Sequence, residues 1–169
     1  RGGVSGLSFC EAVSMGLGSD GGLLVRERIP SLEQNIGHLG GASYSELAFE
    51  IFKLYIDDIA ERDLRQIVEK SYANFSDSKV TPLVQVGEGH VLELFHGPTL
   101  ALKDVALQFL GNIFEHILNQ QNTFLNVLGA TSGDTGSAAI AGLKGKKNIN
   151  VFIMFPEGKT SSVQEKQMT

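Results

Sequence analysis

The chain has 169 residues, of which 42% are hydrophobic and 20% charged, the balance of a folded globular protein rather than of a disordered one. Its formal net charge of −5 offers no basic face to a nucleic acid, and its apolar runs are far shorter than the roughly 20 residues that a membrane-spanning helix needs. The single cysteine, Cys10, cannot form an internal disulfide, so nothing requires an oxidising compartment and we expect a cytoplasmic protein.

The two ends of the chain indicate an incomplete protein. The sequence begins Arg1-Gly2-Gly3 without an initiator methionine, and it stops at Thr169, about two turns into a predicted helix. A helix of that length is marginal when it stands alone. We therefore expect the chain to be a piece of a longer protein.

Residues 1–78 have the pattern of helices joined by glycine-rich turns, and we treat them as one domain. Two capping boxes, each a serine followed three residues later by a glutamate, open two of the helices, and apolar residues at helical spacing predict a third. We find no catalytic constellation in this region and assign it to packing or to an interface. The predicted helices cover 8–16, 44–56 and 61–74, with capping boxes that pair Ser8 with Glu11 and Ser43 with Glu46.

Residues 79–169 alternate short strands with helices and form a second predicted domain. Two strand-like runs around Gly87-Glu88-Gly89 predict a β-hairpin. The strand, helix, strand, helix order that follows predicts a parallel sheet with right-handed crossovers, so the fold class is α/β. The predicted strands are 81–86, 90–95, 125–128 and 151–155; the predicted helices are 103–118, 134–143 and one capped by Ser161 or Ser162; a tight turn is predicted over 129–133.

This order brings three separate segments to one edge of the sheet. A crossover helix runs antiparallel to the strand after it, so Lys103, at a helix start, is expected near the turn 129–134. The loop 156–159 follows the next strand and is expected at the same edge. In open α/β sheets this edge is where ligands bind.

Lys103 is the first candidate for chemistry. The helix macrodipole disfavours a cation at a helix start, and Leu100, Ala101 and Leu102 precede the lysine, so both features favour an uncharged amine. An uncharged amine is what Schiff-base formation with a carbonyl cofactor requires. The alternative is a surface lysine paired with a nearby aspartate, either Asp104 or Asp134.

The turn from Gly129 to Gly136 is the second candidate. Its small residues bring backbone N–H groups close to a ligand, and the helix start behind them favours an anion. Hydroxyls in the turn would suit a carboxylate or a phosphate. The alternative is plain capping of the helix by a turn residue. The hydroxyl residues are Thr131, Ser132 and Thr135, and the capping candidates are Ser132 and Asp134.

Other common sites are not indicated. The turn lacks the Lys-Ser/Thr of a Walker loop and the glycine spacing of a dinucleotide fingerprint. The four histidines and Cys10 show no metal-ligand spacing, so we expect no metal site. His96 is interpreted as a loop or core histidine, and Lys144, Lys146 and Lys147 as a solvated turn.

Several segments resemble the threonine synthase family, in the right order and over essentially the whole chain. The segment 93–104, Glu-Leu-Phe-His-Gly-Pro-Thr-Leu-Ala-Leu-Lys-Asp, resembles the cofactor-lysine segment of that family. The segments 130–136, 155–159 and 164–168 resemble the stretches that follow it, and residues 1–3, 8–12 and 20–23 resemble the family's N-terminal region.

The resemblance implies a pyridoxal-phosphate lyase of fold type II, the tryptophan-synthase-β-like fold, that converts O-phospho-L-homoserine and water to L-threonine and phosphate. Lys103 would be the Schiff-base lysine and proton carrier. The turn would bind the substrate carboxylate through Thr131, Ser132, Gly133, Asp134 and Thr135, with Asp134 also near the cofactor ring hydroxyl.

Two departures from the family pattern matter. Leu102 stands where the family has phenylalanine, which affects packing beside the lysine. The family's cup for the cofactor phosphate and its large second domain come after the segment that matches Thr169. We therefore expect the 169-residue chain alone to bind pyridoxal phosphate weakly, to have little activity, and to expose apolar surface that promotes association.

Two other functions remain open from sequence alone. One is a threonine-synthase-like phospho-lyase that eliminates phosphate and gives 2-oxobutyrate. The other is a non-catalytic α/β interaction module that retains the scaffold without the cofactor. Lys103 beside a Ser-Gly-Asp turn argues against the module.

Overall fold

The computed structural model describes residues 3–32 and 36–169. The chain divides into two compact units, Arg1–Val68 and Glu69–Thr169. The domain boundary expected after residue 78 stays a prediction. None of the helices in the described part of the chain has the length and apolarity needed to cross a bilayer.

The first unit is helical, as the capping boxes predict. α1 (Phe9–Met15) and α2 (Tyr44–Phe52) both begin with a complete capping box, in which the serine side chain accepts from the glutamate N–H and the glutamate side chain accepts from the serine N–H. A short 3₁₀ helix, Ile36–His38, precedes α2. α2 ends earlier than the predicted residue 56, because the carbonyl of Phe52 accepts from the N–H groups of both Tyr55 and Ile56 in a tight turn.

Phe49 anchors the core of this unit. Its side chain is fully buried, and the guanidinium of Arg65 stacks over its ring with 3.9 Å between the guanidinium carbon and the ring centroid. Arg65 lies on α3 (Glu61–Tyr72), whose Leu64 and Val68 are also fully buried. The helical spacing of Leu64 and Val68 therefore marks a core face of α3, as predicted, whereas Phe49 was not predicted as a core residue.

The second unit begins with the predicted hairpin. β1 (Leu83–Val86) and β2 (Gly89–Leu92) pair antiparallel around a two-residue turn in which Gly87 has a φ of 60°. Both strands are shorter than predicted. Pro82, which has no N–H to donate, limits pairing at the open end to one further hydrogen bond, from the Glu93 N–H to its carbonyl.

The parallel sheet consists of β3 (Leu125–Ala130) and β4 (Ile149–Met154), paired over all six residues. The parallel arrangement and the α/β class are confirmed. The predicted strand 125–128 is two residues too short: Gly129 and Ala130 have the composition of a turn but pair with Ile153 and Met154. The turn therefore begins at Thr131.

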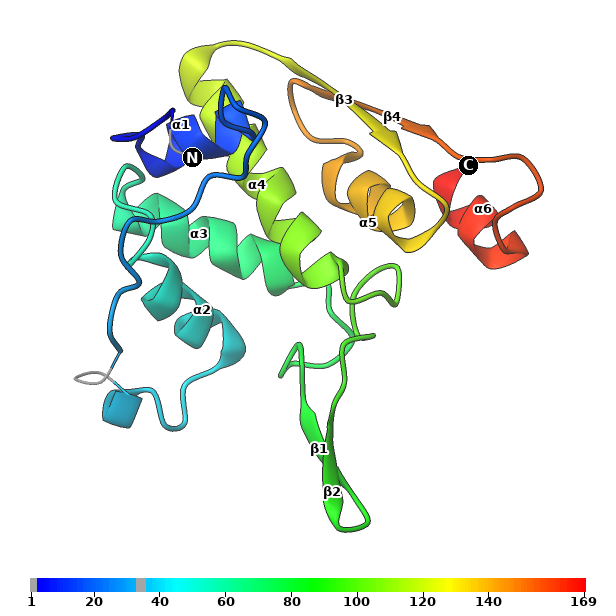
Figure 1. Cartoon of the computed structure of the whole chain (residues 1–169). Helices are drawn as coiled ribbons and strands as arrows, with labels where there is room; N and C mark the ends of the chain where they lie inside the picture. The colour runs from blue at the N-terminus through cyan, green and yellow to red at the C-terminus, as the bar shows by residue number, and fades with distance from the viewer. Residues whose placement is uncertain (1–2, 33–35) are drawn as a thin grey trace. The chain divides into compact units, whose positions relative to one another are not determined.

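Two helices cover one face of this sheet. α4 (Asp104–Gln121) and α5 (Asp134–Leu143) lie on the same side of β3 and β4 in Figure 1, and burial alternates along both strands. The opposite face exposes Leu128, Phe152 and Met154, which are 68%, 56% and 56% exposed. The expected exposure of apolar surface is thus confirmed. α6 (Ser162–Met168), capped by Ser161, closes the unit.

Candidate active site

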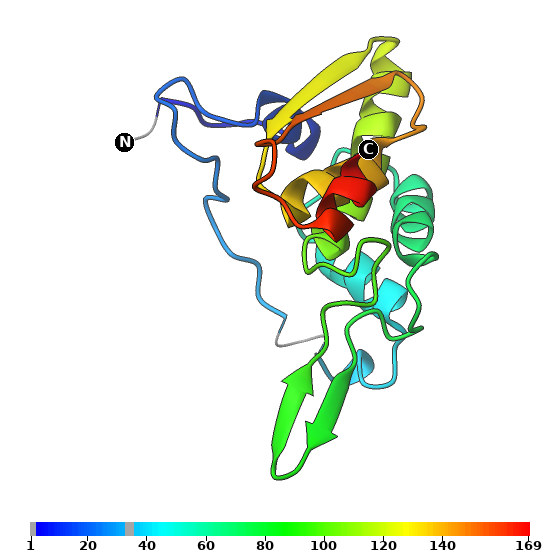
Figure 2. The same ribbon diagram turned by 90° about the vertical axis from the view of Figure 1, so that its right-hand side faces the viewer.

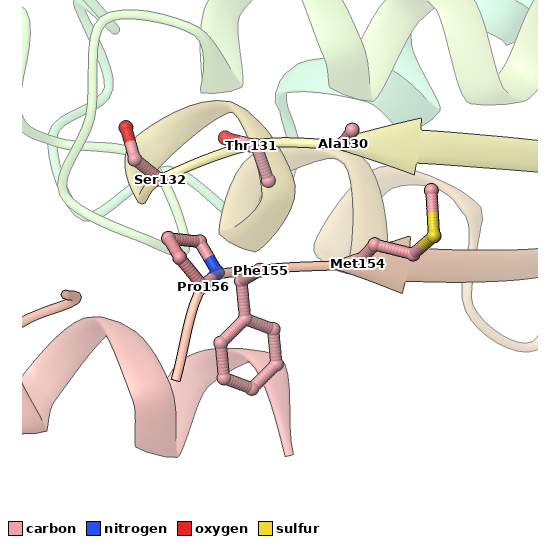
Figure 3. A pocket seen from close by; sticks show the side chains of 6 residues that line it. All are labelled: Ala130, Thr131, Ser132, Met154, Phe155 and Pro156. Atoms are coloured by element: carbon pink, nitrogen blue, oxygen red, sulfur yellow. The ribbon is translucent and has the colours of Figure 1, made fainter. Parts of the chain in front are cut away.

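An open pocket lies where β3 and β4 end, at their carboxyl ends (Figure 3). Its volume of about 410 Å³ is within the range of about 300–1,000 Å³ that small-molecule sites occupy. The lining combines apolar side chains with the hydroxyls of Thr131 and Ser132. The lining residues are Ala130, Thr131, Ser132, Met154, Phe155 and Pro156.

The turn between β3 and α5 forms one side of this pocket. The Thr131 N–H donates to the carbonyl of Met154 at 3.0 Å, which extends the parallel pairing into the turn. The Gly133 N–H donates to Thr131 Oγ1 at 3.2 Å, and Gly133 is the N-cap of α5. No side chain caps α5, so the capping alternative for Ser132 and Asp134 is not what the structure shows. A helix start of this kind favours an anion.

Lys103 is the N-cap residue of α4, and its side chain is exposed. The alternative pairing of this lysine with an aspartate has no support in the geometry, because the carboxylates of Asp104 and Asp134 accept from other side chains. Leu100 and Leu102 are 68% and 59% exposed, so these two side chains do not provide the apolar surroundings that we expected around the amine.

The segment 97–103, here called the lysine loop, is held by Asp104. This carboxylate is fully buried and accepts from Thr99 with both oxygens, from the N–H at 2.7 Å and from Oγ1 at 2.7 Å. The Ala101 N–H adds a longer bond of 3.4 Å. Gly97 is required at its position, since a Cβ there would overlap the Asp104 side chain. The loop before the lysine therefore has one defined path.

α6 connects the lysine loop to the turn. Gln167 Nε2 donates to the carbonyl of Thr99 at 3.2 Å, and Gln164 Nε2 donates to Asp134 Oδ1 at 2.7 Å. In Figure 2 the lysine loop runs beneath α6. These contacts join two segments that the sequence separates by about 30 residues. That the Lys103 amine itself approaches the turn stays a prediction.

Sequence reasoning missed the glutamines of α6. Gln164 forms the capping box of α6 with Ser161, one of the two predicted capping serines. Nothing in the local pattern indicates its second bond, to Asp134. The signal that could have found both glutamines is their spacing of three residues, which places them on one side of a helix that begins directly after the predicted ligand edge.

The predicted solvated lysine turn needs a correction at Lys146. Its side chain is only 15% exposed, its Nζ donates to Asn112 Oδ1, and it lies 3.8 Å from Glu115 Oε2. Burial, followed by the charge of Lys70, lowers the pKa of Lys146. Lys144 and Lys147 are exposed as expected.

His96 is held by two neighbouring side chains. His96 bonds through Nε2 to Glu93 at 2.7 Å and through Nδ1 to Ser76 at 3.2 Å, the partners of a loop histidine. Within residues 3–32 and 36–169, no group of three or more His, Cys, Asp or Glu side chains is arranged to hold a metal ion.

The donor set suits the cofactor that the sequence predicts. A flat ring could lie against the apolar lining beside Phe155 and Pro156, and a carboxylate could bind at the turn hydroxyls and the start of α5. A primary amine is available on the lysine loop, although Lys103 does not line the pocket. The residues present thus fit pyridoxal phosphate.

Comparison with known proteins finds threonine synthases. The family model described as the N terminus of threonine synthase matches residues 1–72. A curated threonine synthase of Schizosaccharomyces pombe is 51% identical over all of this chain, which spans 35% of that relative. A solved structure described as PLP-bound threonine synthase from Brucella melitensis matches 99% of this chain with a TM-score of 0.93 and 42% identity, and the chain spans 37% of it.

The yeast threonine synthase structure gives the same result, with a TM-score of 0.92 and 48% identity over 96% of this chain and 35% of that one. The matched residues include the helical first unit and the parallel sheet. The chain spans about a third of the length of these relatives. By sequence and by fold, the chain is similar along essentially its whole length to the N-terminal third of threonine synthases.

Proposed function

We propose that this chain contributes the lysine and the substrate-carboxylate turn of a threonine synthase, which converts O-phospho-L-homoserine and water to L-threonine and phosphate with pyridoxal phosphate. One observation supports this above all: the lysine loop and the Ser-Gly-Asp turn, far apart in sequence, are both bonded to α6. The kinship with threonine synthases supplies the reaction.

When bound, pyridoxal phosphate supplies an electron sink that makes protons on substrate carbons removable. Lys103 would hold the cofactor through its amine, and its Nζ would take and return protons at successive substrate carbons. The flexible end of a lysine suits this task, while the Asp104 contacts keep its backbone fixed.

The turn would bind the substrate carboxylate. Thr131, Ser132 and Thr135 would offer hydroxyls, and the start of α5 at Gly133 would offer backbone N–H groups. Asp134 would face the ring hydroxyl of the cofactor, with Gln164 fixing its carboxylate from the other side. These roles are proposed from the residues and their family resemblance.

The residues that bind the cofactor phosphate and the substrate phosphate belong, in this proposal, to the part of the relatives that this chain does not match. The 169 residues alone are therefore expected to bind pyridoxal phosphate weakly and to turn over little substrate. The proposal includes a small-molecule substrate and a cytoplasmic location, and no nucleic-acid or membrane partner.

The test uses the protein as its gene encodes it, supplied with pyridoxal phosphate and phosphohomoserine. We expect equal amounts of phosphate and threonine, and at least a thousandfold loss in Lys103→Ala, on the order of what a lost proton carrier and covalent anchor cost together. A Lys144→Ala variant, altered at an exposed lysine, is the matched control and should keep the wild-type rate.

The products separate this proposal from the alternatives. Phosphate with 2-oxobutyrate in place of threonine would identify a phospho-lyase. No phosphate release from protein that retains its fold would favour a non-catalytic module.

A further inference from the structure

Two glutamines of α6 lie between the parts of the candidate site and reach both of them. Gln164 and Gln167 are three residues apart, so their side chains leave the helix on the same side. Gln164 bonds to Asp134 of the turn, and Gln167 bonds to Thr99 of the lysine loop. Both glutamines are half-buried.

The Gln164 amide is fully oriented by its neighbours. Its Oε1 accepts from the Ser161 N–H at 3.2 Å and from Ser161 Oγ at 3.1 Å, which completes the capping box. Its Nε2 therefore points the other way, at Asp134 Oδ1, at 2.7 Å. A glutamate would serve the capping box equally well. Only the amide of glutamine can also donate to a carboxylate.

The turn side is shaped to receive α6. A Cβ at Gly133 would overlap the Gln164 amide, and a Cβ at Gly136 would overlap Thr131 Cγ2 and lie 2.8 Å from the sulfur of Met168. Two glycines thus leave room for two α6 side chains. The contact between Gly136 and Met168 is separate from the hydrogen bond between Gln164 and Asp134, and it supports the same placement of α6 against the turn.

On the lysine loop, the contact with α6 is made by the backbone carbonyl of Thr99. Asp104 takes the Thr99 N–H and hydroxyl, and Gln167 Nε2 takes its carbonyl at 3.2 Å. Thr99 is thereby fixed through three groups by two helices. Thr99 lies four residues before Lys103 in the chain.

We propose that Gln164 and Gln167 are positioning residues, which hold Asp134 and the lysine loop at a fixed separation through α6. The inference rests on the proposed function for its catalytic consequence but not for its structural one. A helix turn is a stiff spacer, so the two bonds set where the turn and the loop stand relative to each other. Neither glutamine touches the reacting atoms in this account.

The first experiment needs no cofactor. Backbone hydrogen exchange is followed by mass spectrometry in the whole protein, for wild type, Gln164→Glu and Gln167→Glu. We expect Gln164→Glu to speed exchange in residues 131–136 about three- to tenfold, because it faces Asp134 with a second carboxylate while leaving the capping box intact. Gln167→Glu should speed exchange in 97–103 by a similar factor.

Two variants make this result specific. Glu165→Gln makes the reverse exchange of carboxylate for amide at an exposed neighbour on the same helix, and it should leave both segments unchanged. In Gln164→Glu combined with Asp134→Asn, the asparagine amide donates to the glutamate, so the bond returns with its polarity reversed and slow exchange in 131–136 returns with it. Unchanged exchange in both single variants, or loosening confined to α6 itself, would overturn the proposal.

The second experiment measures the catalytic consequence. Gln164→Glu should raise KM for phosphohomoserine more than it lowers kcat, because it disturbs the carboxylate turn, and Gln167→Glu should do the reverse. Equal effects on both constants in both variants would contradict positioning. If the wild type shows no activity the proposed function fails, while the exchange experiment still decides whether α6 holds the two segments.

Discussion

Gly111 on α4 lies directly against the backbone of Gly142 on α5: a Cβ at Gly111 would overlap the Gly142 carbonyl. A Cβ at Gly142 would in turn overlap the carbonyl of Leu107. The two helices that carry Lys103 and Asp134 at their starts therefore cross with backbones in contact. Because the backbones are in contact, the two helices have little room to shift relative to each other.

Gly111→Ala should therefore destabilise the protein by about 1–3 kcal/mol, since the extra carbon forces the helices apart. The measurement is the free energy of unfolding in urea. Gly89→Ala is the matched control, because its Cβ would meet nothing nearer than 3.8 Å and the change in chain entropy is the same. Equal stability of the two variants would contradict the close crossing.

Asp104→Asn should loosen the lysine loop. The buried carboxylate accepts from two N–H groups and one hydroxyl. In asparagine one of the two oxygens becomes an NH₂ group, which cannot accept and would face a donor. We expect a loss of about 1–3 kcal/mol in unfolding free energy and faster exchange in 97–103. Unchanged exchange there would show that Asp104 does not hold the loop.

Glu115 should give the protein an acid-sensitive contribution to stability. Burial alone would raise the pKa of its carboxyl. Hydrogen bonds from Lys70 and from the backbone N–H of Lys147, with the charge of Lys146, outweigh burial and hold the pKa below its ordinary value of 4.5. The unfolded chain therefore binds the proton more readily, so this contribution is complete above pH 4.5 and is lost as the pH falls through the lower folded pKa.

Urea unfolding from pH 3 to 7 tests this contribution. In Glu115→Gln the unfolding free energy should be lower at pH 7, and its fall with acid should be shallower than in wild type. Parallel curves for the two proteins would show that the carboxyl titrates alike in both states.

Cys10 should be an unreactive thiol. Burial first, and then the hydrogen bond and charge of Asp58, raise the pKa of Cys10 to about 12. The thiolate is the reactive form, so alkylation at pH 8 should be slower than for free cysteine by on the order of a hundredfold. Asp58→Asn should speed it. Rapid labelling of the folded wild type would contradict this account.

The features predicted well from sequence are those set by neighbours in the chain. The capping boxes at Ser8 and Ser43 depend on residues three positions away, so sequence alone locates these helix starts, and it narrows the cap of α6 to Ser161 or Ser162. The parallel order of β3 and β4 follows from the alternation of strands and helices.

The features predicted poorly depend on distant partners. Gly129 and Ala130 look like a turn, but pairing with β4 makes them a strand. Lys146 looks solvated, but Asn112 and Glu115, on α4, draw it into the protein. The bond from Gln164 to Asp134 has no local signal either, because its two residues meet only when α6 folds back onto the turn.

The central claim is that Lys103 is the residue that captures pyridoxal phosphate, and covalent trapping tests it directly. The whole protein is incubated with pyridoxal phosphate, reduced with borohydride and digested with trypsin. Between Lys79 and Lys144 the chain has one cleavage site, Lys103, and a modified lysine resists trypsin. We predict one labelled peptide spanning residues 80–144, absent in Lys103→Arg. Label on another lysine, or none in folded protein, would contradict the account.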